Sequence, residues 1–201
     1  DADEELVAAP VCRLAGRRPA RRALHGGLQF GAWQHARRAL VEGHDDVGAD
    51  GMLYVADSGN YAIRRVTPGG STSTFVGGSA GTSDGAGGSA QFSTPRYLAV
   101  DVGGNLYVTD GRRIRKVTPQ GVVSTHPASA PLMAEATSGD LLGGIAVDSN
   151  GVIYISDRNA IRKIMPDGGV TTFAGSIDER GHVDGVGAEA RFSPPHGFTR
   201  D

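Results

Sequence analysis

The sequence lacks the residues on which several classes of protein depend. It has one cysteine, Cys12, which excludes an internal disulfide framework and a zinc site built from cysteines. It has no run of about 18 apolar residues, so we expect no membrane-spanning helix. Its 20 basic and 22 acidic residues nearly balance, and a nucleic-acid partner requires a strongly basic surface. We therefore predict no nucleic-acid partner and no membrane insertion.

Glycine, in contrast, is abundant, and it punctuates a repeat. The chain has 31 glycines in 201 residues, about twice the usual share. Three similar stretches begin at Gly51, Gly104 and Gly151 and read GMLYVADSGNYAIRRVTPGG, GNLYVTDGRRIRKVTPQG and GVIYISDRNAIRKIMPDGG. The tyrosines of these stretches are spaced 53 and 47 residues apart, and an aspartate follows each at the same offset. These structural repeat residues are Tyr54, Asp57, Tyr107, Asp110, Tyr154 and Asp157.

The length and content of the repeat select an architecture. Each unit of about 50 residues contains short runs rich in Val, Ile, Tyr and Thr, bounded by Gly, Pro or Asp, which is typical of β-strands. In the middle unit these runs are Tyr97–Asp101, Asn105–Asp110, Arg113–Thr118 and Val122–His126. A repeat of this length with four strands predicts the blade of a β-propeller. We predict an all-β fold: a partial, open β-propeller of about three four-stranded blades, with a non-repeat N-terminal segment.

A second motif joins the units. It reads DGAGGSAQFSTPRYLAVD from Asp84 and DGVGAEARFSPPHGFTRD from Asp184. The middle unit carries PASAPLMAEATSGDLLGG instead, and His126 stands where the other units have phenylalanine. We therefore expect the junction between the second and third units to be less well packed. Asp84 and Asp184 fit tight turns, with calcium binding as the weaker alternative because each loop offers one carboxylate. We predict no cofactor.

LYVADSGNYAIRRV, together with the DGxGAxARFSPPHG linker, resembles the NHL-repeat β-propeller family, in its bacterial multi-repeat form. The resemblance covers about 150 of the 201 residues, from Gly51 to Asp201. It implies NHL-like blades that usually close a ring of about six, and a secreted or periplasmic location. With only about three blades here, we expect either that the natural product continues or that this chain is a piece of it. The remaining blades, of the same or a longer chain, are then its partners.

Residues 1–47 differ in kind from residues 48–201, which we assign to the propeller. The N-terminal segment holds seven arginines, seven acids and the one tryptophan, and it shows no repeat. Three explanations stay open: an independent helical or disordered extension, an arm for nucleic acid or a membrane surface, and a shift of the coding frame upstream of Gly51. The last explanation predicts a poorly ordered segment, and the nucleotide sequence would test it.

Most of the repeated charged residues have a structural interpretation. An aspartate that ends the second strand of every unit is typical of a turn, and the arginine that follows each unit's isoleucine pairs with such groups. The carboxylates Asp101, Asp148 and Asp201 end the innermost strands. They could line an axial channel for a divalent cation, as in related propeller lactonases and lyases, or simply close hairpins.

Positions where the units differ indicate binding better than shared positions do, because every blade needs the shared residues to fold. Arg96, Tyr97 and His196 start innermost strands, differ between units and are expected to face one mouth of the propeller. We predict a non-catalytic binding or scaffold propeller whose partner is a protein or a carbohydrate. The alternative is a metal-dependent hydrolase or lyase, similar to a lactonase, that uses the axial channel.

Overall fold

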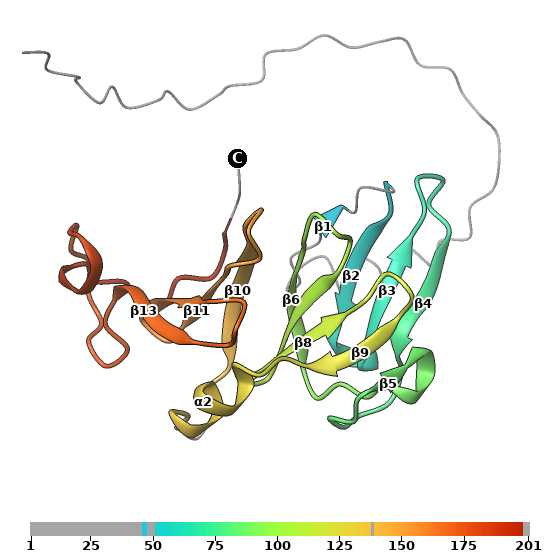
Figure 1. Ribbon diagram of the computed structural model, residues 1–201, viewed down its shortest axis with the longest axis horizontal. Coiled ribbons are helices and arrows are strands. Elements are labelled where there is room, and N and C mark those ends of the chain that lie inside the picture. The colour runs from blue at the N-terminus through green and yellow to red at the C-terminus, as the bar shows by residue number, and fades with distance from the viewer. Residues whose placement is uncertain (1–45, 48–50, 138, 199–201) are drawn as a thin grey trace, which may run out of the picture.

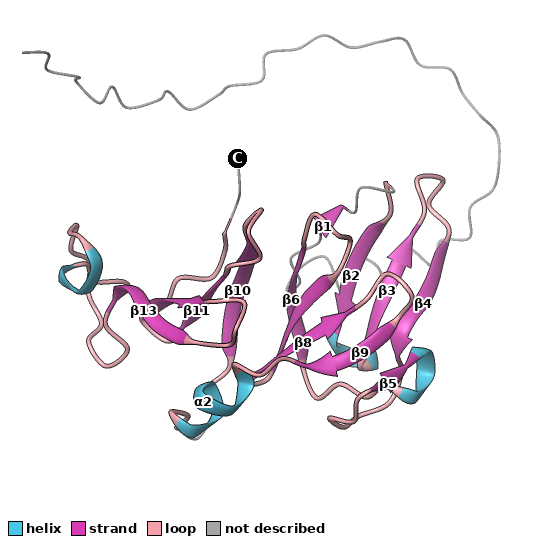
Figure 2. Ribbon diagram, in the orientation of Figure 1, coloured by secondary structure: helices cyan, strands magenta, loops and turns pink. Residues whose placement is uncertain are grey.

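The structure is a computed structural model, and it describes residues 46–47, 51–137 and 139–198. These residues form three antiparallel sheets that follow one another in an arc (Figure 1). Helix is confined to four short turns, and strands dominate the described chain (Figure 2). The fold prediction is therefore confirmed: the described part of the chain is all-β, and its sheets form a partial propeller that does not close. The predictions for residues 1–45 lie outside the described residues.

Each sheet is a meander in which consecutive strands pair. The first contains β1 (Asp46–Val47), β2 (Leu53–Asp57), β3 (Ala62–Val66) and β4 (Thr72–Gly77). The second contains β6 (Pro95–Val100), β7 (Leu106–Asp110), β8 (Arg113–Val117) and β9 (Val122–Thr125). The third contains β10 (Leu142–Val147), β11 (Ile153–Asp157), β12 (Ala160–Ile164) and β13 (Val170–Gly175). In each sheet the first of these strands lies toward the middle of the arc.

The strand register follows the tyrosine spacing. Tyr54 pairs with Asp46, Tyr107 with Ala99, and Tyr154 with Ala146, so each tyrosine faces the residue eight positions before it. Strand β1 therefore lies where β6 and β10 lie in their own sheets. Asp46 and Val47 form β1 and therefore belong to the first sheet, although our sequence prediction places them in the non-repeat segment.

A short extra strand links the first sheet to the second. Strand β5 (Gly85–Ala86) belongs to the linker that follows β4, yet it pairs with β9 at the outer edge of the second sheet. The turn η2 (Gly87–Ser89) follows it. The first blade is thus tied to the second both by the chain and by backbone hydrogen bonds across the junction.

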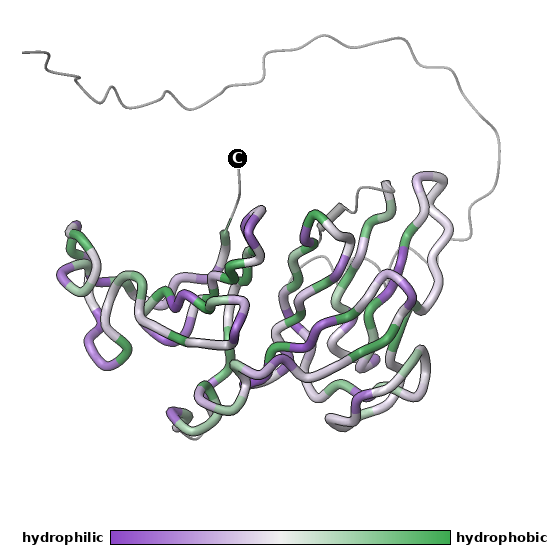
Figure 3. Tube along the Cα trace, in the orientation of Figure 1, coloured by the Kyte–Doolittle hydropathy of each residue, from purple (hydrophilic) through white to green (hydrophobic). Residues whose placement is uncertain are grey.

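The core lies between successive sheets. Hydrophobic and hydrophilic residues are interspersed along the strands (Figure 3). Two clusters of buried side chains involve the middle sheet, one shared with the first sheet and one shared with the third. One cluster of buried side chains fills the first junction and contains Tyr54, Ile63, Val76, Phe92, Leu98, Leu106 and Val108. A second fills the other junction and contains Tyr97, Tyr107, Ile114, Leu132, Ile145, Ile153 and Ile155.

The expectation of a poorly packed second junction is wrong. The replaced linker forms the helix α2 (Ser129–Ala134), whose Leu132 is fully buried, as is Ala128 just before it. Burying a leucine side chain contributes about 1.5–3 kcal/mol, so the helix compensates for the missing linker motif. A different sequence therefore fills the same gap between blades.

Candidate functional site

Each repeated aspartate is the last residue of a strand, and its carboxylate binds other groups of the protein. Asp110, the last residue of β7, is fully buried and accepts hydrogen bonds from the backbone N–H groups of Ser93 and Thr94, at 2.7 and 2.5 Å. Its second oxygen lies 3.2 Å from Nη1 of Arg115, a fully buried guanidinium on β8. A carboxylate that accepts this many bonds has little capacity left for a ligand.

Arg115 is the centre of the first junction. Besides Asp110, its guanidinium donates to the carbonyl oxygens of Gln91 and Ser83, at 2.8 and 3.0 Å, and to the Asp84 carboxylate at 2.9 Å. These acceptors all lie in the linker between β4 and β6. The guanidinium carbon also lies 5.2 Å from the ring centroid of Phe92, which adds a cation–π contact.

Asp84 is a junction residue rather than a lone turn carboxylate. It accepts hydrogen bonds from the backbone N–H and the hydroxyl of Thr125, at 3.1 and 2.9 Å. Partial burial alone would raise the pKa of Asp84, but the Thr125 hydrogen bonds and the Arg115 charge outweigh it and lower the pKa. Asp84 therefore stays ionised near neutral pH and holds the edge of the second sheet to the linker.

The second junction performs the same task with different residues. Asp157 is fully buried and pairs with Arg112 and with Arg162, the residue of β12 that corresponds to Arg115. Glu135, just after α2, takes the position of Asp84: its Oε2 lies 2.6 Å from Nη1 of Arg162. The hydrogen bond from Arg162 lowers the pKa of Glu135 and outweighs the opposing effect of burial.

Sequence reasoning missed Arg112 and Glu135. Arg112 is 8% exposed and donates to the carbonyl oxygen of Leu132 through both Nε and Nη2, at 3.2 and 2.5 Å. The available signal was an extra acidic residue in the replaced linker, where a basic partner in the next blade required one. If the replaced linker had been expected to supply its own acid in place of Asp84, Glu135 would have been predicted as the partner of Arg162.

In the first blade, no linker within the described residues contacts the corresponding groups, Asp57 and Arg64. Asp57 is only half-buried, and its carboxylate oxygens accept hydrogen bonds from the side-chain amide of Asn60 at 3.0 and 2.9 Å. Arg64, also half-buried, donates from Nη1 to the hydroxyl of Thr74 at 3.0 Å. Among the described residues, no carboxylate forms an ion pair with Arg64.

The carboxylates at the ends of the innermost strands close hairpin turns. Asp101 accepts bonds from the backbone N–H groups of Gly103 and Asn105, each at 2.8 Å, and Asp148 accepts from those of Asn150 and Val152. Burial would raise the pKa of Asp101, but these hydrogen bonds, that of the Asn105 side-chain amide and the Lys116 charge lower it. Asp201 lies outside the described residues.

The aromatic repeat is reproduced as a ring pair in every blade. Tyr54 and Tyr107 are 7% and 6% exposed, whereas Tyr154 in the last blade is half-buried. Each tyrosine ring contacts a ring on the outer side of its own blade, with centroid distances of 5.3 Å to Phe75, 6.2 Å to His126 and 5.3 Å to Phe173. His126 thus occupies a phenylalanine position, and burial, with the Lys116 charge, lowers its pKa.

The three candidate mouth residues separate into two groups. Tyr97 is 5% exposed and belongs to the core of the second junction, so it offers little surface to a partner. Arg96 is half-buried with its guanidinium 5.6 Å from the Tyr97 ring centroid, and His196 is exposed. Gly143 of β10 corresponds to both, so Arg96, Gly143 and His196 are matching positions of consecutive repeats. Strands β6 and β10 pack side by side (Figure 1).

Glycines at the start of β10 allow the chain before His196 to approach closely. A Cβ on Gly144 would lie 2.5 Å from the carbonyl oxygen of His196, and one on Gly143 would lie 3.5 Å from that of Pro195. A side chain at Gly144 would therefore displace this segment. The backbone at His196 is held against β10, while the imidazole remains exposed.

Residues 46–47, 51–137 and 139–198 contain no group of three His, Cys, Asp or Glu side chains that could hold a metal ion. Among the helices of these same ranges, none has the length and apolar character needed to cross a membrane.

Comparison with known proteins gives structural neighbours only. Neither the family models nor the curated proteins give a match. A structural genomics protein of unknown function from Bacteroides thetaiotaomicron superposes with a TM-score of 0.59 at 25% identity, over 76% of this chain and 40% of its own. An auxiliary nutrient binding protein from Bacteroides ovatus superposes with a TM-score of 0.54 at 18% identity, over 73% and 35%. The chain thus spans about two fifths of these neighbours, which support a β-propeller fold.

Proposed function

We propose that this chain belongs to a non-catalytic binding propeller of the NHL-repeat type, whose rigid blades present a partner-binding surface for a protein or a carbohydrate. The observation that carries the proposal is the use of the repeated charged groups. Arg115 and Arg162 are buried and pair across the junctions with Asp84 and Glu135, and buried Asp157 pairs across the second junction with Arg112. Buried Asp110 pairs with Arg115 within the second blade, so these repeated groups act in folding. The positions left to recognise a partner are those where the blades differ.

Arg96 and His196 are the residues that we propose for recognition. A guanidinium beside an aromatic ring and an exposed imidazole donate hydrogen bonds and stack on flat faces, which suits sugar hydroxyls and peptide carbonyls. Gly143 leaves the position between them without a side chain. On the family resemblance alone, we also propose a bacterial protein with a secreted or periplasmic location.

A metal-dependent hydrolase or lyase is the alternative. It would require free carboxylates at the axial ends of the innermost strands. Asp101 and Asp148 instead accept two backbone hydrogen bonds each on one oxygen, as hairpin residues do. The geometry therefore favours binding over catalysis at this end of the blades.

A glycan array and a peptide array probed with the full chain would test this function. We expect one of the two arrays to give a hit whose binding weakens about tenfold or more in Arg96→Ala and His196→Ala. Asp167→Asn, a change in an exposed turn between β12 and β13, is the matched control and should leave binding unchanged. Divalent-cation-dependent turnover of a lactone or a uronate polymer would instead establish the alternative, and the absence of any hit on either array would contradict the proposal.

A further inference from the structure

At the joint between the first two blades, a linker from the first blade docks on the outer edge of the second. We call the linker the plug and the edge that receives it the socket. The first linker, residues 78–94, supplies the plug: β5 pairs with β9, and Asp84 sits between Arg115 and Thr125. The second blade supplies the socket, in which Arg115 and Thr125 are cross-strand partners. The turn before β9 also covers the first blade, since a Cβ on Gly121 would lie 3.6 Å from the Phe75 ring.

The last linker, residues 176–194, is folded as a second plug. Phe192 packs against Gly175 as Phe92 packs against Gly77, with a would-be Cβ contact of 2.8 Å in both. The backbone bond from Gly181 to Phe192 matches that from Gly81 to Phe92, at 3.0 Å each. The turn η3 (Gly187–Glu189) repeats η2, and Gly187 and Gly87 have φ angles of 56° and 55°. The loop has therefore taken its docked conformation already.

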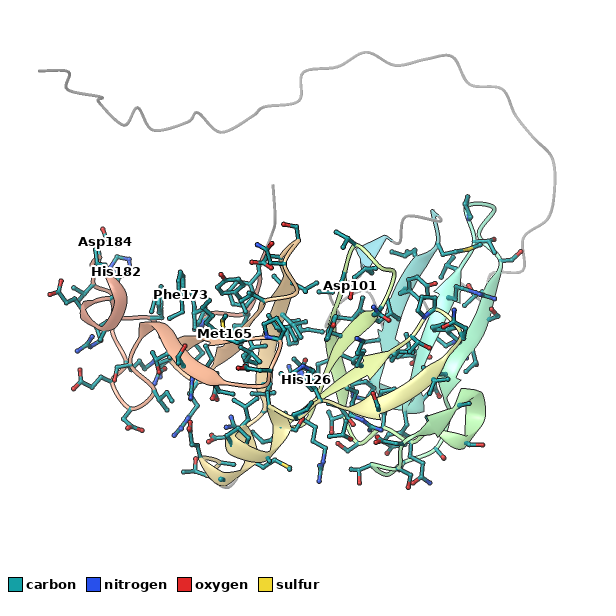
Figure 4. All side chains as sticks on the ribbon, viewed as in Figure 1. Asp101, His126, Met165, Phe173, His182 and Asp184 are labelled. Atoms are coloured by element: carbon teal, nitrogen blue, oxygen red, sulfur yellow. The ribbon has the colours of Figure 1, made fainter. Side chains whose placement is uncertain are left out.

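This second plug faces away from the other blades. Asp184, the counterpart of Asp84, is exposed and forms no hydrogen bond or ion pair with the described residues. Figure 4 shows it at the far end of the third sheet, with Phe173 nearby on the same blade. Phe173 is 52% exposed and Val186 is 85% exposed, whereas Phe75, the counterpart of Phe173, is partly buried against the core. A charged contact and an apolar contact are thus both left open.

The first blade carries an open socket of the same design. Arg64 pairs across strands with Thr74, as Arg115 does with Thr125. The outer edge of β4 is exposed from Thr72 to Thr74, and among the described residues no strand pairs with it. Gly70, the counterpart of Gly121, has no atom within 4 Å of a would-be Cβ. A basic socket at one end of the arc therefore complements an acidic plug at the other.

We infer that the chain associates head to tail with a second copy of itself. The last linker of one copy docks on β4 of the other, with Asp184 between Arg64 and Thr74 and Gly185–Val186 added as a strand along the β4 edge. Phe173 packs against the turn at Gly70. Such an interface joins two different surfaces, so it closes into a ring or propagates as a filament. Two copies together contribute six sheets, a number within the range of closed propellers, and we infer the closed dimer.

Preorganisation and charge argue for this occupant. A plug that is already folded loses little conformational entropy on docking, and the added strand satisfies backbone groups at an exposed edge. The ion pair is partly desolvated once the edge is covered, as the buried Arg115 guanidinium in the first joint illustrates. The acidic plug and the basic socket lie in one chain, so a second copy offers a complementary surface to each of them.

Charge reversal in two separate variants tests the interface. Asp184→Arg places two cations in the contact, and Arg64→Asp places two anions there, so each variant alone should associate roughly 100-fold more weakly or worse. In an equimolar mixture of the two variants, both interfaces of a heterodimer recover opposite charges. We therefore expect light scattering coupled to size exclusion to give a dimer for the natural chain, monomers for each variant and a dimer for the mixture.

The controls separate folding from association. Asp167→Arg changes an exposed acid of the same blade that lies in the turn between β12 and β13, outside the last linker, and should leave the dimer intact. Circular dichroism melts establish that the variants fold. If Arg64→Asp fails to fold, the neutral single variants Arg64→Met and Asp184→Asn take the place of the charge reversals. Each of these two variants must then weaken the dimer. A natural chain that is monomeric at every concentration overturns the inference, leaving another blade of a longer chain as the occupant. So does a dimer that neither variant weakens.

Discussion

Replacing Arg115 by methionine should cost far more stability than the same change at Arg64. Arg115 is fully buried and its removal leaves the Asp110 carboxylate, also fully buried, without its cationic partner. Orphaning one member of a buried pair typically costs about 3–5 kcal/mol. Arg64 occupies the same repeat position but is half-buried with one hydrogen bond, to Thr74, so its loss should cost about 1 kcal/mol.

Urea unfolding of dilute protein, followed by far-ultraviolet circular dichroism, measures both losses without a contribution from association. A double variant identifies the cause: adding Asp110→Asn to Arg115→Met removes the orphaned charge and should restore part of the loss. Equal losses at Arg115 and Arg64 would refute the reasoning. No recovery in the double variant would show that the loss comes from packing rather than from an uncompensated charge.

Two further predictions concern a histidine and a glycine. Burial and the Lys116 charge lower the pKa of His126, so the folded state binds fewer protons than the unfolded state. The free energy of unfolding that depends on this histidine is therefore fully present above the unfolded pKa of 6.5, and it falls as the pH drops toward the lower pKa of the folded state. His126→Phe should remove this part of the slope in urea midpoints measured between about pH 7 and 5, and an unchanged slope would contradict the assignment. Gly77→Ala, at φ 87° with Phe92 2.8 Å from the new Cβ, should cost more than about 2 kcal/mol. Gly69→Ala, with one neighbour at 3.8 Å, should change thermal stability by less than about 0.5 kcal/mol.

The repeat made the architecture predictable from the sequence. The three blades repeat the same order of strands, so the spacing of the repeat located the strands, and the tyrosine register matches the sheets. Ring contacts likewise confirm that His126 replaces a phenylalanine. What spacing could not provide was the identity of partners across a junction, because residues 31 positions apart, such as Asp84 and Arg115, meet only through the packing of separate blades.

The candidate site was less predictable for the same reason. Tyr97 begins an innermost strand, and its position in the repeat suggested an open mouth; the third blade covers it instead. The substituted linker suggested a weak junction, but Leu132 and Glu135 restore both the packing and the ion pair. An ion pair or a core position depends on the neighbouring blade, which a single repeat does not contain.

The two joints differ in the acid and in the secondary structure that each linker supplies. Tandem domains that are too alike are prone to wrong pairing as the chain emerges from the ribosome. Here the third blade accepts a glutamate that follows a helix, whereas the second accepts an aspartate beside a strand. If the two linkers were exchanged, the arginine of each junction would lack the acid that it pairs with here, or Leu132 would be exposed to solvent. The irregular middle segment thus distinguishes the second joint from the first both by its acid, Glu135, and by its buried Leu132.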